Sequence, residues 1–310
     1  MNKVLFTQDL GVPRSFINSL LNENKLGTDW SLADNKEVQN LDDIVCICTA
    51  SIPLTTESLS KFKNLRIVSM SFTGYDHVDK DYCEKNDIKV FNVPAYSTDS
   101  VAELAIGLAI GLLRKIPLGN SEVRKGNWNE NVPGFELANK TCGIIGTGTI
   151  GCRLAELLAA FKCNIKAWSR TEKDEIISKG GSYVSLNELF KECDLVFITV
   201  SLNENTRNLV SGDQLDLMKD SSYLINVARG PVVNRADLIM YANSGKISGF
   251  GIDVYDYEPL KKDDELRNIS NSIMTPHVAY RTKEALERKA SVTAQNIIAG
   301  LKGGEKNRVI

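Results

Sequence analysis

Few residues of this 310-residue chain can exchange a proton near neutral pH, because it has only two histidines, His77 and His277. His277 follows residues 274–276, at the end of an expected strand, and ligands of open α/β sheets bind beyond strand ends. His77 lies in a polar loop, where a structural or solvent-facing role is the simpler interpretation. His277 is therefore the candidate acid and base, and it needs partners to be more than a structural histidine.

Two charged residues follow the two preceding expected strands. Arg229 comes after the strand that ends near Asn226, and its planar guanidinium suits two-point binding of a carboxylate. Glu258 comes after the strand that ends near Ile252, and a carboxylate beside an imidazole fixes the imidazole tautomer. Each alone could be a surface charge. Together with His277 they predict a site that binds a carboxylate and moves a proton.

A second pattern, the glycines Gly146, Gly148 and Gly151, fits G-x-G-x-x-G. Residues 143–145 are apolar as in a buried strand, and apolar residues recur at helical spacing in 150–161. At such a turn the first glycine allows the bend, the second lets a pyrophosphate approach, and the third lets helix pack on strand. The helix N-terminus directs free N–H groups at the pyrophosphate. This context predicts a dinucleotide site.

The residue type at the end of the next strand indicates which of the two nicotinamide cofactors is bound. An acidic residue there binds the 2′-hydroxyl of NAD, whereas an arginine accommodates the 2′-phosphate of NADP. This chain has Ser169 and Arg170 at that place, with Lys173 close by. We therefore predict that NADP(H) is favoured over NAD(H); the alternative is that Arg170 is a solvated loop charge.

Composition excludes several classes of protein. With 43% hydrophobic and 25% charged residues the chain is globular, and its length suggests about two domains. A net charge of −2 favours a small-molecule partner over nucleic acid or an anionic membrane. The apolar stretch 104–113 is far shorter than the about 20 residues of a membrane span. Seven cysteines without metal-site spacing predict no metal, no disulfide framework and a cytoplasmic location.

Short apolar runs alternate with helical patterns along the chain, which indicates an α/β fold with parallel sheets. In the first part we expect strands at 4–6, 44–47, 67–70 and 90–92. In the second part we expect strands that end near residues 145, 168, 183, 199, 226, 252 and 274. Residues 71–76 follow a strand, so the N–H groups around Thr73 and Gly74 could face a small anion; a plain loop is the alternative.

Two long helices are expected outside these alternations. The first, about 100–114, is apolar on nearly all sides and must be covered on nearly all sides. A homodimer through the 100–126 region is one way to cover it, and a wholly internal helix is the other. The second, about 282–302, is close enough to the end of the chain to return to the first part.

The segments N-V-A-R-G, D-V-Y-D-Y-E-P and T-P-H-V-A, at 226–230, 253–259 and 275–279, resemble the D-isomer-specific 2-hydroxyacid dehydrogenases. That family includes glyoxylate and hydroxypyruvate reductases and glycerate and phosphoglycerate dehydrogenases. The resemblance implies an α/β fold with a Rossmann dinucleotide-binding domain and a smaller flavodoxin-like substrate domain. The Rossmann domain would span 97–282, and the substrate domain 1–96 with 283–310.

The resemblance also implies roles for single residues. Arg229 would bind the substrate carboxylate, His277 would be the acid in reduction, and Glu258 would orient His277. The substrate-binding residues would be Thr73, Gly74, Arg229 and His277. The cofactor-binding residues would be Gly146, Gly148, Thr149, Ile150, Gly151, Ser169, Arg170, Val200, Thr206, Val227, Ala228, Arg229 and Asp253. Asp253 would contact the carboxamide. Tyr280 stands where many members have glycine, and it could narrow the pocket or contact the cofactor.

The implied activity is NAD(P)-dependent reduction of a small, glyoxylate- or hydroxypyruvate-like 2-oxoacid to the D-2-hydroxyacid. The alternative is a corepressor-like protein of the same fold that senses the dinucleotide without turnover. Absence of turnover over a broad panel of 2-oxoacids, with partner binding changed by NAD(P)H, would favour that alternative.

Overall fold

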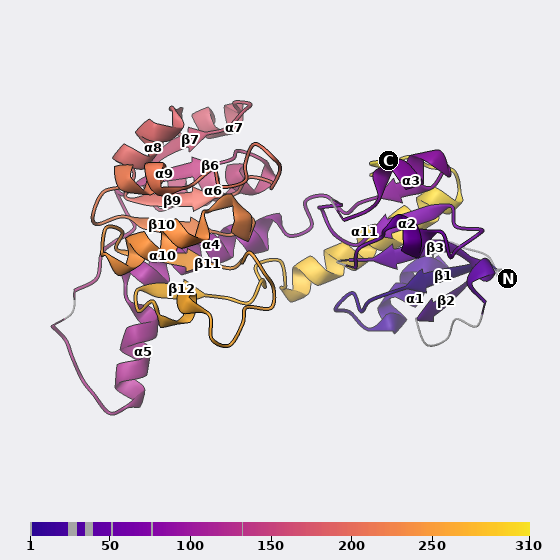
Figure 1. The fold of residues 1–310 in the computed structure, drawn as a ribbon, viewed down its shortest axis with the longest axis horizontal. Helices are drawn as coiled ribbons and strands as arrows, with labels where there is room; N and C mark the ends of the chain where they lie inside the picture. The colour runs from indigo at the N-terminus through magenta and orange to yellow at the C-terminus, as the bar shows by residue number, and fades with distance from the viewer. Residues whose placement is uncertain (1, 24–29, 35–39, 51, 76, 132) are drawn as a thin grey trace. The chain divides into compact units, whose positions relative to one another are not determined.

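The computed structural model describes residues 2–23, 30–34, 40–50, 52–75, 77–131 and 133–310. The chain forms two compact units (Figure 1): unit 1 comprises Met1–Ser97 and Arg281–Ile310, and unit 2 comprises Thr98–Tyr280. The boundaries expected from the sequence lie within two residues of these. Which unit binds substrate stays a prediction, and each unit is described by itself.

Unit 1 contains a five-stranded parallel sheet in the order β2-β1-β3-β4-β5. This is the 2-1-3-4-5 order of flavodoxin-like folds. Its strands are β1 (Asn2–Phe6), β2 (Trp30–Asp34), β3 (Ile44–Thr49), β4 (Ile67–Met70) and β5 (Lys89–Phe91). Its helices are α1 (Arg14–Glu23), α2 (Thr56–Leu59), α3 (Lys80–Lys85) and α11 (Lys283–Leu301), with a 3-10 turn η1 (Leu41–Asp43). Four of the strands match the predicted ones, and β2 was not predicted.

Both faces of the unit 1 sheet are covered, as in other parallel sheets. Residues of α1 and α11 share one apolar cluster, and residues of α2 and α3 share the other. Helix α11 begins where the Thr282 hydroxyl accepts a hydrogen bond from the Ala285 N–H, and it packs against α1 and β4. The predicted return of the C-terminal helix to the first part of the chain is thus confirmed.

Unit 2 contains a seven-stranded parallel sheet in the order β12-β11-β10-β9-β6-β7-β8. Counted from β6, this is the Rossmann order 3-2-1-4-5-6 with one more strand at the edge. The strands are β6 (Thr141–Ile145), β7 (Asn164–Trp168), β8 (Ser182–Tyr183), β9 (Leu195–Ile198), β10 (Tyr223–Asn226), β11 (Gly249–Ile252) and β12 (Ser272–Met274). The predicted fold class is therefore confirmed for this unit.

Most helices of unit 2 cover the two faces of this sheet (Figure 1). The helices of the unit are α4 (Thr98–Leu113), α5 (Ile116–Arg124), α6 (Thr149–Ala160), α7 (Asp174–Ser178), α8 (Leu186–Glu192), α9 (Gly212–Leu217) and α10 (Arg235–Asn243), with 3-10 turns η2 (Gly230–Val232) and η3 (Glu265–Asn268). Side chains of β9 point to both faces of the sheet. Phe197 belongs to the apolar cluster that contains residues of α4 and α6, and Val196 and Ile198 belong to the cluster that contains residues of α8, α9 and α10.

Helix α4 is covered within its own unit. It packs against α6, β10, β11 and β12, and most of its side chains are buried. The internal alternative therefore accounts for its apolar surface without a second subunit. Helix α5 is different, because none of its residues is buried.

All seven cysteines are free thiols, five of them buried and Cys152 and Cys163 partly buried. Among the described residues, no helix combines the length and the apolarity needed to cross a bilayer.

Candidate active site

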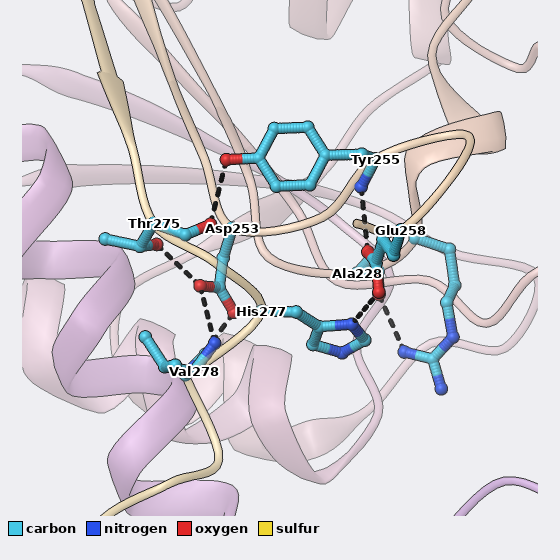
Figure 2. A network of polar contacts seen from close by, with 9 residues as sticks. Ala228, Asp253, Tyr255, Glu258, Thr275, His277 and Val278 are labelled. Carbon is cyan, nitrogen blue, oxygen red and sulfur yellow. Dashed lines mark hydrogen bonds and ion pairs between the residues drawn. The ribbon is translucent and has the colours of Figure 1, made fainter. Parts of the chain in front are cut away.

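The three predicted catalytic residues follow three neighbouring strands at the carboxyl edge of the unit 2 sheet. Arg229 follows β10, Glu258 follows β11 and His277 follows β12. The Nδ1 atom of His277 lies 2.6 Å from Oε2 of Glu258 (Figure 2). Since Nδ1–H donates to the carboxylate, Nε2 is the ring nitrogen left for a substrate.

Glu258 is held ionised by its surroundings. Partial burial, the largest single influence, raises the pKa of Glu258, whereas the hydrogen bonds from His277 and from the Tyr255 N–H, at 3.0 Å, lower it. The positive charge of Arg229 acts in the same direction, so the net pKa of Glu258 lies below its ordinary value. A charged acceptor therefore faces the imidazole at neutral pH.

His277 adopts a left-handed backbone conformation, with φ of 53°. Such a conformation costs about 1–3 kcal/mol and persists only where neighbouring contacts enforce it. Asp253, fully buried after β11, supplies those contacts (Figure 2). Its carboxylate accepts hydrogen bonds from the Val278 N–H at 2.9 Å, the Ala279 N–H at 2.8 Å and the Thr275 hydroxyl at 2.5 Å.

Tyr255 also stabilises the turn that contains His277. Its hydroxyl donates to the Thr275 carbonyl at 2.9 Å (Figure 2). Burial, with the negative charges of Asp253 and Glu258, raises the pKa of Tyr255 to about 12, so the phenol keeps its proton and remains a donor. The ring of Tyr280 stands edge-on to that of His277, with 6.0 Å between the ring centres.

The turn that carries Arg229 is shaped by Asn226 and Gly230. The buried Asn226 side chain accepts from the Ala228 N–H and donates to the Arg229 carbonyl, both at 3.0 Å. A Cβ at Gly230 would lie 2.1 Å from the Tyr255 carbonyl carbon, so only glycine lets this turn approach the loop that leads to Glu258. The Arg229 guanidinium, partly buried, donates to the Ala228 carbonyl at 2.7 Å.

The glycine-rich turn fits a dinucleotide. Gly146 has φ of 98°, and a Cβ at Gly151 would lie 2.0 Å from the Gly146 carbonyl oxygen, so both glycines are required by the turn itself. A Cβ at Gly148 would meet nothing within 4 Å. Gly148 is also the N-cap of α6 and provides no side-chain cap, which leaves the N–H groups around Thr149 and Ile150 to a ligand.

A cavity of about 640 Å³ extends from this turn to the end of β7, a size typical of small-molecule sites. It is lined by the predicted residues Gly146, Gly148, Ser169, Arg170, Val200 and Thr206. Residues that the sequence did not single out also line it, including Thr147, Trp168, Thr171, Thr199 and Asn203. The first four lie beside predicted residues in sequence, which is the one signal that could have found them, whereas Asn203 has no such signal.

The other predicted cofactor residues lie outside this cavity. Val227, Ala228 and Arg229 form the turn after β10, and Asp253 is engaged with the His277 turn. The contact of Asp253 with a carboxamide stays a prediction. A separate cavity of about 510 Å³ is lined by Glu258 and His277 together with the apolar Pro259, Leu260 and Met274.

The predicted carboxylate-binding residues Thr73 and Gly74 belong to unit 1. They follow β4, and the Thr73 hydroxyl donates to the Val93 carbonyl at 3.0 Å, while the Thr73 carbonyl accepts from Asn92 at 2.8 Å. These bonds fix the loop. Its role in substrate binding stays a prediction.

Comparison with known proteins identifies the family. The model of the D-isomer specific 2-hydroxyacid dehydrogenase NAD-binding domain matches residues 106–279. The chain is 33% identical to a glyoxylate reductase of Thermofilum pendens, over 89% of this chain and 84% of that protein. It is 32% identical to a hydroxypyruvate reductase of Blautia hydrogenotrophica, over 90% and 89%.

A solved structure agrees with these relatives. D-lactate dehydrogenase from Aquifex aeolicus, complexed with NAD and lactic acid, matches with a TM-score of 0.86 and 32% identity over 99% of this chain and 98% of that one. The fold and the site thus define an oxidoreductase built on a dinucleotide-binding domain. The chain belongs to the D-isomer specific 2-hydroxyacid dehydrogenase family, and the family's NAD-binding domain lies within unit 2.

The different roles of two glycines give a test of the dinucleotide site. Gly148→Val should abolish dinucleotide binding but leave the melting temperature nearly unchanged, because the added side chain meets only open space in the free protein. Gly151→Ala should instead lower the melting temperature, because its Cβ would clash with the Gly146 carbonyl. Fluorescence titration with NAD(P)H and thermal denaturation measure the two effects. If Gly148→Val bound NAD(P)H as tightly as the wild type, the pyrophosphate could not lie at the glycine-rich turn.

Proposed function

We propose that the protein reduces a small 2-oxoacid, of the glyoxylate or hydroxypyruvate type, to the D-2-hydroxyacid with NADPH. The observation that carries this proposal is the Glu258–His277 pair, 2.6 Å apart, at the edge of a dinucleotide-binding sheet that also bears Arg229. The two relatives named for glyoxylate and hydroxypyruvate reduction support the substrate class.

In this mechanism the reduced nicotinamide, when bound, supplies the hydride that adds to the 2-carbon. Arg229 binds the substrate carboxylate through its planar guanidinium and polarises the 2-oxo group. His277, in its protonated form, gives the Nε2 proton to the oxygen that becomes the 2-hydroxyl. Glu258 holds Nδ1 and balances the charge of the imidazolium, so the ring keeps one orientation through the proton transfer.

In unit 1, Thr73 and Gly74 are the residues we propose for carboxylate binding, through their backbone N–H groups. Val227 and Ala228 would face the nicotinamide end of the cofactor, and Val200 and Thr206 its adenosine side. The alternative of a dinucleotide sensor without turnover has no observation of its own in its favour.

Removal of the imidazole tests the proton-transfer role. His277→Ala should lower kcat about 10²- to 10⁴-fold, the usual contribution of general acid catalysis, while NADPH still binds. His77→Ala is the matched control, because it removes the chain's other histidine, which bonds the Ala50 carbonyl at 3.1 Å in unit 1. Initial rates with glyoxylate and hydroxypyruvate, and nucleotide titration, give both quantities. Near-normal turnover by His277→Ala would exclude His277 as the acid.

We further propose NADP(H) as the favoured cofactor. Ser169 and Arg170 line the cavity after β7, where the family pattern that uses NAD has an acidic residue, and Arg170 is exposed towards solvent. An exposed guanidinium with a neighbouring hydroxyl suits a phosphate better than a ribose hydroxyl.

The wild-type enzyme should therefore show a higher kcat/KM with NADPH than with NADH. Arg170→Ala should lower kcat/KM for NADPH about 10- to 100-fold, the value of a hydrogen bond to a charged group, and leave that for NADH nearly unchanged. Steady-state kinetics with both nucleotides measures this. Equal or better efficiency of the wild type with NADH would refute the preference.

A homodimer through the 100–126 segment is the third part of the proposal. Because α4 is covered within unit 2, the support now comes from α5, where Ile116, Leu118 and Val123 are each more than half exposed. Trp128, just beyond, is 78% exposed. Apolar side chains gathered on one exposed helix are typical of a surface that meets another protein.

Sedimentation velocity should give twice the chain mass of 34.2 kDa for the wild type. Leu118→Glu should shift the protein to the monomer, because the charge would be buried without a partner. Ile177→Glu is the matched control, since Ile177 is as exposed as Leu118, 53% each, but lies on α7 outside the segment. A monomeric wild type, or equal effects of both variants, would contradict this interface.

A further inference from the structure

Three hydroxyl-mediated bonds connect the glycine-rich turn with the loop that follows β7. The Tyr183 hydroxyl accepts a hydrogen bond from the Lys173 N–H at 2.8 Å and donates one to the Thr147 hydroxyl at 2.9 Å. The Thr147 hydroxyl in turn donates to the Thr171 carbonyl at 3.3 Å. Each hydroxyl uses its single proton once, so the three bonds form one consistent chain.

The position of Tyr183 separates it from direct ligand binding. Thr147, Thr171 and Lys173 line the cavity together with Ser169 and Arg170, whereas Tyr183, at the end of β8, is not one of its lining residues in the described part of the chain. Thr147 is 2% exposed and belongs to the turn, between Gly146 and Gly148. Tyr183 therefore acts on the cavity only through the residues it holds.

The loop needs such support. Arg170, Thr171 and Lys173 are exposed, so little apolar burial fixes their backbone. A phosphate bound by several donors is bound tightly only when the donors are already in place, because ordering them on binding reduces affinity. The bonds of Tyr183 at Lys173 and of Thr147 at Thr171 hold this loop at two points before a ligand arrives.

The glycine-rich turn has supports of its own. The Gly146 N–H donates to the Trp168 carbonyl at 2.8 Å, and the Gly146 carbonyl accepts from the Thr199 hydroxyl at 2.7 Å. Loss of the Tyr183 hydroxyl should thus disturb the loop after β7 more than the turn that receives the pyrophosphate.

We propose that Tyr183 is a positioning residue for cofactor selectivity: its hydroxyl, together with that of Thr147, preforms the Ser169–Lys173 loop as the binding site for a 2′-phosphate. This inference rests on the proposed use of NADP(H) and adds to it the structural reason why the loop selects the phosphate. The selectivity comes from loop shape as well as from the charge of Arg170.

Two nucleotides that differ only in the 2′-phosphate test the inference without turnover. Isothermal titration calorimetry of the whole protein with adenosine 2′,5′-bisphosphate and adenosine 5′-monophosphate gives both dissociation constants. Tyr183→Phe should weaken binding of the bisphosphate about 3- to 10-fold, as expected for the loss of one or two hydrogen bonds, and that of the monophosphate about twofold or less. Thr147→Val should shift selectivity in the same direction, and Tyr241→Phe, a partly buried tyrosine on α10 outside the cavity, should leave it unchanged.

The outcomes separate this inference from the cofactor proposal. If the wild type binds both nucleotides equally, the preference for NADP(H) fails, and the inference fails with it. If the wild type prefers the bisphosphate and folded Tyr183→Phe and Thr147→Val keep that preference in full, the inference alone is overturned. Equal weakening of both nucleotides in both variants would show a general structural role and would overturn it too.

Discussion

The buried carboxylate of Asp253 is the constraint on which the geometry of the candidate site depends. It accepts three hydrogen bonds from the segment around His277, which itself adopts a left-handed backbone conformation. Hydrogen bonds to a charged group are worth about 1.5–3 kcal/mol each, so three of them exceed the about 1–3 kcal/mol cost of that conformation. The hydrogen bonds to Asp253 therefore offset the conformational cost of the turn that places Nδ1 of His277 next to Glu258.

At the neighbouring strand β10, a buried polar side chain likewise stabilises the turn that follows the strand. Asn226, the last residue of β10, bonds the backbone of Ala228 and of Arg229. Asn226 ends β10 and Asp253 directly follows β11, where the sheet no longer satisfies the backbone, and each bonds to backbone groups of the turn that carries a candidate site residue. Side chains fixed at strand ends hold their turns more rigidly than residues within long loops could, which is the condition for a site with precise geometry.

The sequence predicted those features that have local signals. The glycines at 146, 148 and 151, the strand ends of unit 2 and the Glu258–His277 contact followed from spacing, apolar runs and the family resemblance. Strand β2 was missed because residues 30–34 form a short run with two polar members, in which Ala33 ends the alternation after Leu32. The bonds of Asp253 and Tyr183 could not be predicted, because they join residues 10 to 36 positions apart whose proximity exists only in the folded sheet.

The order of strands explains why one edge of unit 2 can serve two tasks. Strands β6 and β9 are neighbours in the sheet but lie on either side of β7 and β8 in the sequence, which makes their border the switch point of the topology. The glycine turn and the Ser169–Arg170 loop lie on one side of it, and Arg229, Glu258 and His277 follow strands on the other. The glycine turn and the loop after β7 are thus separated along the edge from the three strand ends that carry Arg229, Glu258 and His277. Changes in the loop after β7 can alter nucleotide selection without changing the turn that holds the imidazole, because that turn follows β12 at the other end of the sheet order.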